Sequence, residues 1–143
     1  MTHFAAIVPP FLSHLRAFEA IAWQLQQHGH RVTFIQQADV GALLVLPAAG
    51  FAAIGTDTHP PGSLAAVVRR AASPGPFGIR RVIADMAAST ELFCREAPAV
   101  LRALEVDAVL ADQMEPAGAL LAEHLGLPFV SIACALPFNR EPL

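Results

Sequence analysis

Residues 4–16 read F-A-A-I-V-P-P-F-L-S-H-L-R, and this stretch decides the expected fold. The apolar run over residues 4–9 predicts a strand that is buried on both faces. Four apolar residues then recur at helical spacing: Leu15, Phe18, Ala22 and Leu25. Because Gly29 stands where such a helix would stop, we expect a helix over residues 15–28. The connection contains no glycine, whereas dinucleotide-binding folds place glycines there to cradle a pyrophosphate, so a nucleotide-dependent oxidoreductase is disfavoured.

Short apolar runs alternate with longer helical patterns along the rest of the chain, which is typical of β-α-β units. The expected strands cover residues 4–9, 31–35, 51–54, 108–111 and 129–133. The expected helices cover residues 15–28, 39–46, 63–72, a long segment from 79 that Pro98 either kinks or divides, and 116–125, with a loop over 55–62. We therefore predict an α/β fold, a Rossmann-like doubly wound parallel sheet of about five strands, in one domain spanning residues 1–143.

Composition narrows the functional class. The chain is 55% hydrophobic with a net charge of −3, which argues against nucleic acid as a partner. All nine basic residues are arginine, so a phosphorylated signalling receiver, which needs a lysine after its fifth strand, is excluded. The longest uncharged run, residues 40–56, is shorter than the roughly 20 apolar residues of a membrane span, and no basic region precedes the first apolar run. We therefore expect a cytoplasmic protein.

Two polar groups follow the strands that flank the expected reversal of strand order. In a doubly wound sheet, ligands bind at the carboxyl ends of these strands, which here are the first and the fourth. Ser13 and His14 follow the first strand and Asp112 follows the fourth. We expect Ser13 to cap the helix, and His14 and Asp112 to form a dyad that deprotonates a hydroxyl. The alternative is that His14 only starts a surface helix and Asp112 only caps a helix or ends a turn.

Other candidates are weaker. Asp57 and His59 are read as solvated turn residues, and Glu115 as a cap and first-turn charge for the next helix that could also contact a ligand hydroxyl. No group of His, Cys, Asp and Glu has metal-ligand spacing, so no metal site is expected. An apolar cleft is expected beside the dyad, lined by Phe11, Leu12, Met114, Leu136, Pro137 and Phe138. The last three could instead contact a further domain.

Several segments resemble a known family. The stretch L-Q-Q-H-G-H-R-V-T-F (residues 25–34), preceded by His14, resembles the opening of glycosyltransferases that use nucleotide-activated sugars and have the two-domain GT-B fold. Five segments in order closely resemble the bacterial members that glucosylate carotenoids: H-F-A-A-I-V-P-P-F-L-S-H (3–14), V-T-F-I-Q-Q (32–37), G-T-D-T-H-P-P-G (55–62), D-Q-M-E-P-A-G-A-L (112–120) and A-C-A-L-P-F-N-R-E-P (133–142). The wider family commonly has Gly and Pro where this chain has Ser13 and Ala17.

The resemblance implies a function and a site. It implies an inverting transfer of glucose from UDP-glucose, a donor substrate rather than a cofactor, to a hydroxyl on the ionone ring of the carotenoid zeaxanthin, without a metal. His14 would be the catalytic base and Asp112 its partner. The acceptor-binding residues would be Phe11, Ser13, Met114, Glu115, Pro137 and Phe138.

The resemblance also bears on the extent of the protein. In the family the first domain binds the acceptor and the second binds the nucleotide sugar. Because no helix follows to cover the last strand, we expect residues 1–143 to be the N-terminal acceptor-binding part, with the C-terminal donor-binding domain absent. The alternative function is a non-catalytic acceptor-binding half, or a truncated remnant, that needs a separate donor domain. A carotenoid lies in a membrane, so peripheral contact with its inner face is also expected.

Overall fold

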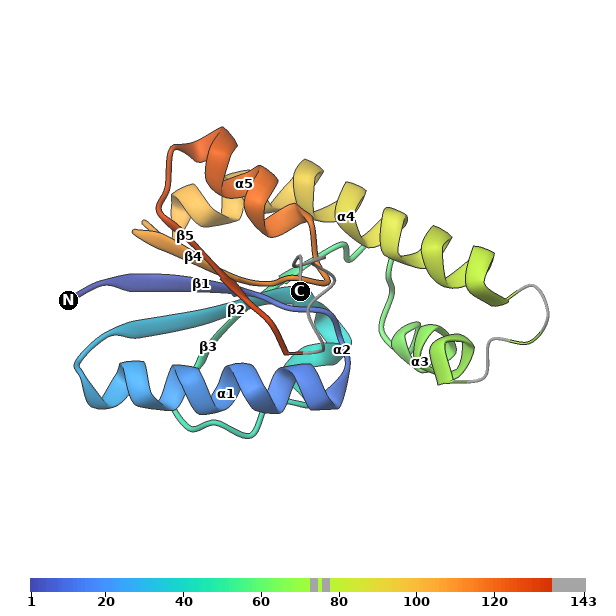
Figure 1. Ribbon diagram of the computed structural model, residues 1–143, viewed down its shortest axis with the longest axis horizontal. Helices are drawn as coiled ribbons and strands as arrows, with labels where there is room; N and C mark the ends of the chain where they lie inside the picture. Colours follow the sequence, from blue (N-terminus) through green and yellow to red (C-terminus); the bar gives the residue numbers. More distant parts are fainter. Residues whose placement is uncertain (73–74, 76–77, 135–143) are drawn as a thin grey trace, which may run out of the picture.

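A computed structural model describes residues 1–72, 75 and 78–134 of the chain. Five strands form one parallel sheet in the order β3-β2-β1-β4-β5, with helices on both faces (Figure 1). The strands are β1 (His3–Ile7), β2 (Arg31–Gln37), β3 (Gly50–Ile54), β4 (Ala108–Asp112) and β5 (Phe129–Ile132). The helices are α1 (Leu12–Gln27), α2 (Ala38–Gly41), α3 (Leu64–Ala72), α4 (Gly78–Ala103) and α5 (Ala117–Leu125). The predicted fold class is confirmed, and so is the reversal of strand order beside β1.

The central strand supplies side chains to two separate cores. Ala5 and Ile7 point to one face of the sheet, where they join a core formed with α4 and α5. Ala6 and Val8 point to the other face, where the core is formed with α1 and α2. Side chains alternate between the faces along a strand, so a strand covered on both sides must be apolar at every position. This explains why residues 4–8 carry no polar group.

Four element boundaries differ from the prediction by two or more residues. β1 ends at Ile7 rather than at residue 9, and β2 runs two residues further than expected, to Gln37. α1 begins at Leu12 rather than at residue 15. α2 ends at Gly41, not at residue 46. Asp39 was expected to cap that helix, but its carboxylate instead accepts the backbone N–H groups of Gly62 and Leu64, at 2.8–3.0 Å. Asp39 therefore anchors the loop before α3, and these hydrogen bonds hold the pKa of its carboxyl below the usual value.

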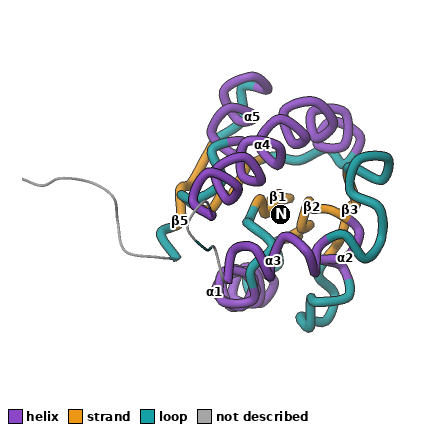
Figure 2. The backbone as a smooth tube through the Cα atoms, turned by 90° about the vertical axis from the view of Figure 1, so that its right-hand side faces the viewer, coloured by secondary structure: helices purple, strands orange, loops and turns teal. Residues whose placement is uncertain are grey.

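Helix α4 is continuous through Pro98, although proline lacks the amide hydrogen that helices use. The helix is held there because Phe93, Ala97 and Leu101 are all buried in the core above the sheet. At about 1.5 Å per residue its 26 residues span roughly 39 Å, whereas a five-residue strand spans about 17 Å. The N-terminal half of α4 therefore projects past the sheet, and α3 lies beside it (Figures 1 and 2). No helix in the described part of the chain is long and apolar enough to span a bilayer.

Helix α5 lies unusually close to β4. A Cβ atom added to Gly118 would lie 2.1 Å from the Cβ of Ala111, far inside van der Waals contact. Gly118 is therefore required for the close approach of the helix to the strand. Ala111 directly precedes Asp112, so this contact also fixes the end of β4 at which the candidate site is built.

The Gly118→Ala substitution is expected to lower the free energy of unfolding by about 1–3 kcal/mol, because the added methyl overpacks the core. The gain in helix propensity, about 1 kcal/mol, does not offset this cost. Urea denaturation of the variant measures the change. The matched test adds Ala111→Gly, which removes the opposing methyl. Recovery of part of the lost stability supports the contact, whereas equal stability of Gly118→Ala and the parent chain would contradict it.

Candidate active site

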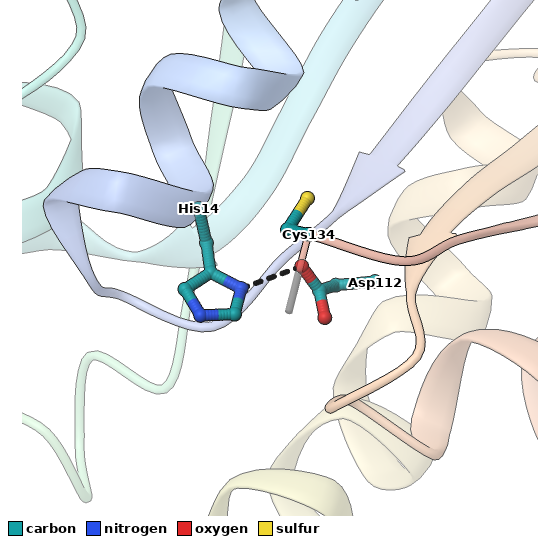
Figure 3. Close-up of side chains that lie close together, drawn as sticks. All are labelled: His14, Asp112 and Cys134. Carbon is teal, nitrogen blue, oxygen red and sulfur yellow. Dashed lines mark hydrogen bonds and ion pairs between the residues drawn. The ribbon is translucent and has the colours of Figure 1, made fainter. Parts of the chain in front are cut away.

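His14 and Asp112 meet at the carboxyl ends of β1 and β4. After β1, the segment containing Pro9 and Pro10 leads directly into α1, so that His14 lies in the first turn of the helix. Asp112 is the last residue of β4, the neighbour of β1 in the sheet. The Nδ1 atom of His14 lies 2.7 Å from Oδ2 of Asp112 (Figure 3), and their side chains are 14% and 0% exposed. The two residues, 98 positions apart, thus form a largely buried pair.

The partners of Asp112 determine the tautomer of His14. Oδ1 of Asp112 accepts the backbone N–H of Met114 at 2.8 Å, which fixes the orientation of the carboxylate. A carboxylate only accepts hydrogen bonds, so Nδ1 of His14 must carry the hydrogen that joins the pair. In the neutral ring, Nε2 is then left with a lone pair. The arrangement is that of a base whose second nitrogen is free to take a proton.

Cys134 is a third member of this group that the sequence analysis did not identify. Its Sγ atom and the nearest ligand atoms of His14 and Asp112 lie within 4.8 Å of one another (Figure 3). Burial, together with a hydrogen bond to Asp112 and its negative charge, raises the pKa of Cys134 to about 12. Without a metal ion the thiol is therefore protonated at neutral pH, whereas a metal ion bound by this group would deprotonate it, because cysteine binds metals as its thiolate. Its position just after β5, the neighbour of β4, was the available signal.

A cavity of about 400 Å³ opens in front of His14. Of the residues expected in an acceptor cleft, Phe11, Met114 and Glu115 line it, together with His14 itself. Ser13 does not line this cavity: it is exposed, and it borders a second depression beside Leu12 and Asp39. The predicted residues Pro137 and Phe138, and also Leu136, lie outside the described residues.

The predicted capping role of Ser13 is wrong. The N-cap of α1 is Phe11, and no side chain caps it. Phe11 donates its N–H to the carbonyl of Pro9 at 2.8 Å and accepts the N–H of Leu15 at 2.9 Å. This turn after the two prolines starts the helix before Ser13 is reached, so the serine lies within the first turn with its side chain exposed.

Helices α3 and α4 supply cavity walls that the sequence analysis missed. Val67 of α3 and Val82, Met86 and Leu92 of α4 line the cavity. In the sequence these residues have only the spacing of an ordinary apolar helix stripe, and that spacing does not distinguish a cavity wall from a core. His59, which was read as a solvated turn residue, also lines the cavity, whereas Asp57 is exposed as expected.

Two polar groups in the cavity wall have no partner among the described residues. These are Nε2 of Gln37 at the end of β2 and Oγ of Ser63 before α3. The neighbouring Gln36 is satisfied, because its Nε2 donates to the carbonyl of Val8 at 3.0 Å and so ties β2 to the segment after β1. The cavity is therefore mainly apolar but retains unused hydrogen-bonding capacity in its wall.

Glu115 is a buried carboxyl beside the dyad. It accepts hydrogen bonds from Ser89 and Thr90 of α4, at 3.1 and 3.0 Å. A longer contact of 3.4 Å comes from the N–H of Ala117. The N-cap of α5 is nevertheless Pro116, without a side-chain cap, and no acidic residue lies in the first turn, so the predicted role of Glu115 as a cap and first-turn charge is wrong. Burial raises the pKa of Glu115, and the negative charge of Asp112 raises it further. The hydrogen bonds that Glu115 accepts lower this pKa, but the net shift is upward. The cavity thus contains a carboxyl with an increased tendency to be neutral.

The chain is similar to known proteins both in sequence and in fold. No protein-family model matches the chain. It is similar to the zeaxanthin glucosyltransferase of Pantoea ananas, with 55% identity over 142 residues, and to that of Pseudescherichia vulneris, with 44% identity over 151 residues. Each match covers 99% of this chain and 33% of the relative. The chain thus spans about a third of the length of these relatives.

Solved structures with the same arrangement are glycosyltransferases. The spinosyn rhamnosyltransferase SpnG, complexed with thymidine diphosphate, matches with a TM-score of 0.70 and 22% identity over 99% of this chain and 37% of its own. The glycotransferase of kitacinnamycin matches with a TM-score of 0.67 and 18% identity, over 92% and 30% of the two chains. By sequence over its whole length the chain resembles the N-terminal third of the zeaxanthin glucosyltransferases, and its fold is that of the GT-B glycosyltransferases.

Proposed function

We propose that the chain is the acceptor-binding part of a glucosyltransferase that transfers glucose from UDP-glucose to a hydroxyl of zeaxanthin or a similar carotenoid. The observation that carries the proposal is the 2.7 Å contact between His14 and Asp112, with His14 in the wall of a mainly apolar cavity. The names of the similar proteins give the transferred sugar, glucose, and the acceptor, zeaxanthin, whereas UDP as the carrier of the glucose is part of the proposal. Because the chain spans a third of those relatives, contacts to the donor are proposed to lie in the remaining length.

In the proposed reaction His14 acts as the base. Its free Nε2 takes the proton of the acceptor hydroxyl while the hydroxyl oxygen attacks the anomeric carbon of the sugar. The bond between that carbon and the phosphate oxygen breaks, UDP leaves with the electron pair, and the configuration inverts. The positive charge formed on the imidazole is stabilised by the buried carboxylate of Asp112. No group of this chain needs to form a covalent intermediate.

The cavity is suited to one end of a carotenoid. Its volume of about 400 Å³ is within the roughly 300–1,000 Å³ of small-molecule sites. It would take the terminal ring with its hydroxyl, while the long polyene would extend outside. Phe11 and Met114 would contact the ring. Glu115, with its raised pKa, could donate a hydrogen bond to a ring oxygen when it is neutral.

The second candidate is a non-catalytic acceptor-binding half that becomes active only with a separate donor-binding chain. The observation that favours it is the coverage of one third of each relative, together with a cavity built within this chain. Supplying the remaining two thirds of a relative in trans distinguishes the candidates. Rescued glucosylation supports a split enzyme, and failure of the chain to bind the carotenoid supports a remnant.

His14→Ala, in a polypeptide of the relatives' full length, is expected to lower kcat by about 100- to 10,000-fold, because general-base catalysis contributes that factor. Asp112→Asn should also lower kcat, since an asparagine amide can donate to Nδ1 and would favour the wrong tautomer. Turnover of UDP-glucose with zeaxanthin measures both effects. His28→Ala, at an exposed position after α1, is the control. Normal kcat in the His14 variant would exclude this residue as the base.

The Glu115→Gln substitution is expected to change the pH dependence of stability. The raised pKa means that the native chain holds this proton more tightly than the unfolded chain, so the stability it contributes is lost as pH rises through the folded pKa. The variant should therefore gain stability relative to the parent chain as the pH rises from about 4.3, the ordinary pKa of glutamate, through the raised pKa of the folded chain. Urea denaturation across this range measures the difference, with exposed Glu123→Gln as the control. Parallel profiles of Glu115→Gln and the parent chain would contradict the assigned pKa shift.

A further inference from the structure

One end of the molecule concentrates positive charge in a chain that is negative overall. Residues 64–84, which include α3 and the start of α4, contain four arginines and no acidic residue, although the net charge of the chain is −3. Arg69, Arg80 and Arg81 are exposed. None of the three has an ion-pair partner among the described residues. Their charges are therefore available to an external partner.

Apolar side chains are exposed on the same two helices. Ile79 and Ile83 of α4 are 72% and 59% exposed, and Val68 of α3 is 38% exposed. The N-terminal half of α4 and α3 together form the end of the molecule that lies away from the N-terminus (Figure 1). Large aliphatic side chains that are exposed beside unpaired arginines often mark an interaction site. A partner that contacts both kinds of side chain must be anionic and apolar.

The fourth arginine holds the two helices together. Arg70 of α3 donates from Nε and a terminal nitrogen to the two carboxylate oxygens of Asp85 on α4, at 2.8 and 2.9 Å. This paired contact neutralises the acidic residue that faces α3. It leaves the outer side of the helix pair without negative charge over residues 64–84.

We propose that this projecting end of the molecule, which exposes Val68, Arg69, Ile79, Arg80, Arg81 and Ile83 and is called the arginine surface, docks on an anionic phospholipid bilayer. Arginine side chains are attracted to a negatively charged lipid surface, and the isoleucines can enter the boundary between headgroups and acyl chains. A nucleic acid would use the arginines but would leave the isoleucines in water. The lipid surface is therefore the partner that accounts for both kinds of side chain.

The arginine surface is formed by the same two helices that supply cavity walls. Val67 and Val82 line the cavity, and their chain neighbours Val68 and Ile83 are exposed on the arginine surface. A carotenoid dissolved in the docked bilayer could then present its terminal ring to the cavity without crossing bulk water. This delivery role rests on the proposed function, whereas lipid binding rests only on charge and exposure.

Vesicle sedimentation with the chain alone tests the proposal, with no donor or acceptor present. Vesicles of phosphatidylcholine with phosphatidylglycerol should bind the chain, and vesicles of phosphatidylcholine should bind it weakly. Arg80→Gln with Arg81→Gln should reduce binding by roughly 25-fold, because each arginine near the surface contributes about a 5-fold factor. The control, Arg31→Gln with Arg102→Gln, removes the same charge at exposed positions elsewhere and should stay within about 2-fold of the parent.

Ile79→Ser with Ile83→Ser tests the apolar part. This variant should also bind anionic vesicles more weakly, while its binding stays sensitive to salt. Circular dichroism of each variant verifies the fold.

Equal binding to both kinds of vesicle, or an equal loss in the two arginine pairs, would overturn the proposal. Tight binding of a short DNA duplex that needs Arg80 and Arg81 but is indifferent to the isoleucines would replace the lipid by a nucleic acid. Lipid binding can be measured without glucosylation. If the chain binds lipid but the full-length polypeptide does not transfer glucose, the proposed function is wrong and the lipid proposal stands.

Discussion

The parallel pairing of β1 with β4 is the constraint on which the candidate site depends. Ile7 pairs with Ala111, so the next residue of β4, Asp112, lies beside the segment that leads into α1. A buried carboxylate costs several kcal/mol unless it is paired and hydrogen-bonded. Asp112 has such compensation from His14, from the N–H of Met114 and from the thiol of Cys134. The sheet therefore imposes the position of the acid, and the acid in turn orients the imidazole.

The sequence was sufficient for the fold and for the meeting of His14 with Asp112. Both follow from local signals, namely an uninterrupted apolar strand and the rule that ligands bind where strand order reverses. Boundaries were less predictable where polar side chains make tertiary hydrogen bonds. Gln36 was expected to lie beyond the end of β2. Its side-chain amide instead donates a hydrogen bond to the carbonyl of Val8, and the strand continues through Gln37. Asp39 was expected to cap a helix in its own segment, but its carboxylate accepts hydrogen bonds from residues more than 20 positions away.

The cleft beside the dyad was predicted, but only part of its lining was, for a related reason. The walls that were missed come from α3 and α4, whose placement depends on how far α4 extends past the sheet and on the pair formed by Arg70 and Asp85. Neither is visible in a hydrophobic pattern. The net charge of −3 does not describe this end of the molecule, because it averages a locally acid-free segment with the acidic remainder of the chain. A charge sum describes the field at long range, while recognition depends on the groups that one surface presents.

The contacts that arrange the dyad lie within the described residues of this chain. In the proposed reaction, this chain would therefore supply the part of the rate enhancement that comes from the base. General-base catalysis contributes about 10²–10⁴, whereas holding two reactants in the correct geometry is worth effective molarities of about 10⁵–10⁸ M. Under the proposed function, the base is preformed here, and the larger factor requires the sugar donor to be held against the cavity by further residues. A chain of this length could then have a fully assembled base and still turn over negligibly, so low activity by itself would be no argument against the role of His14.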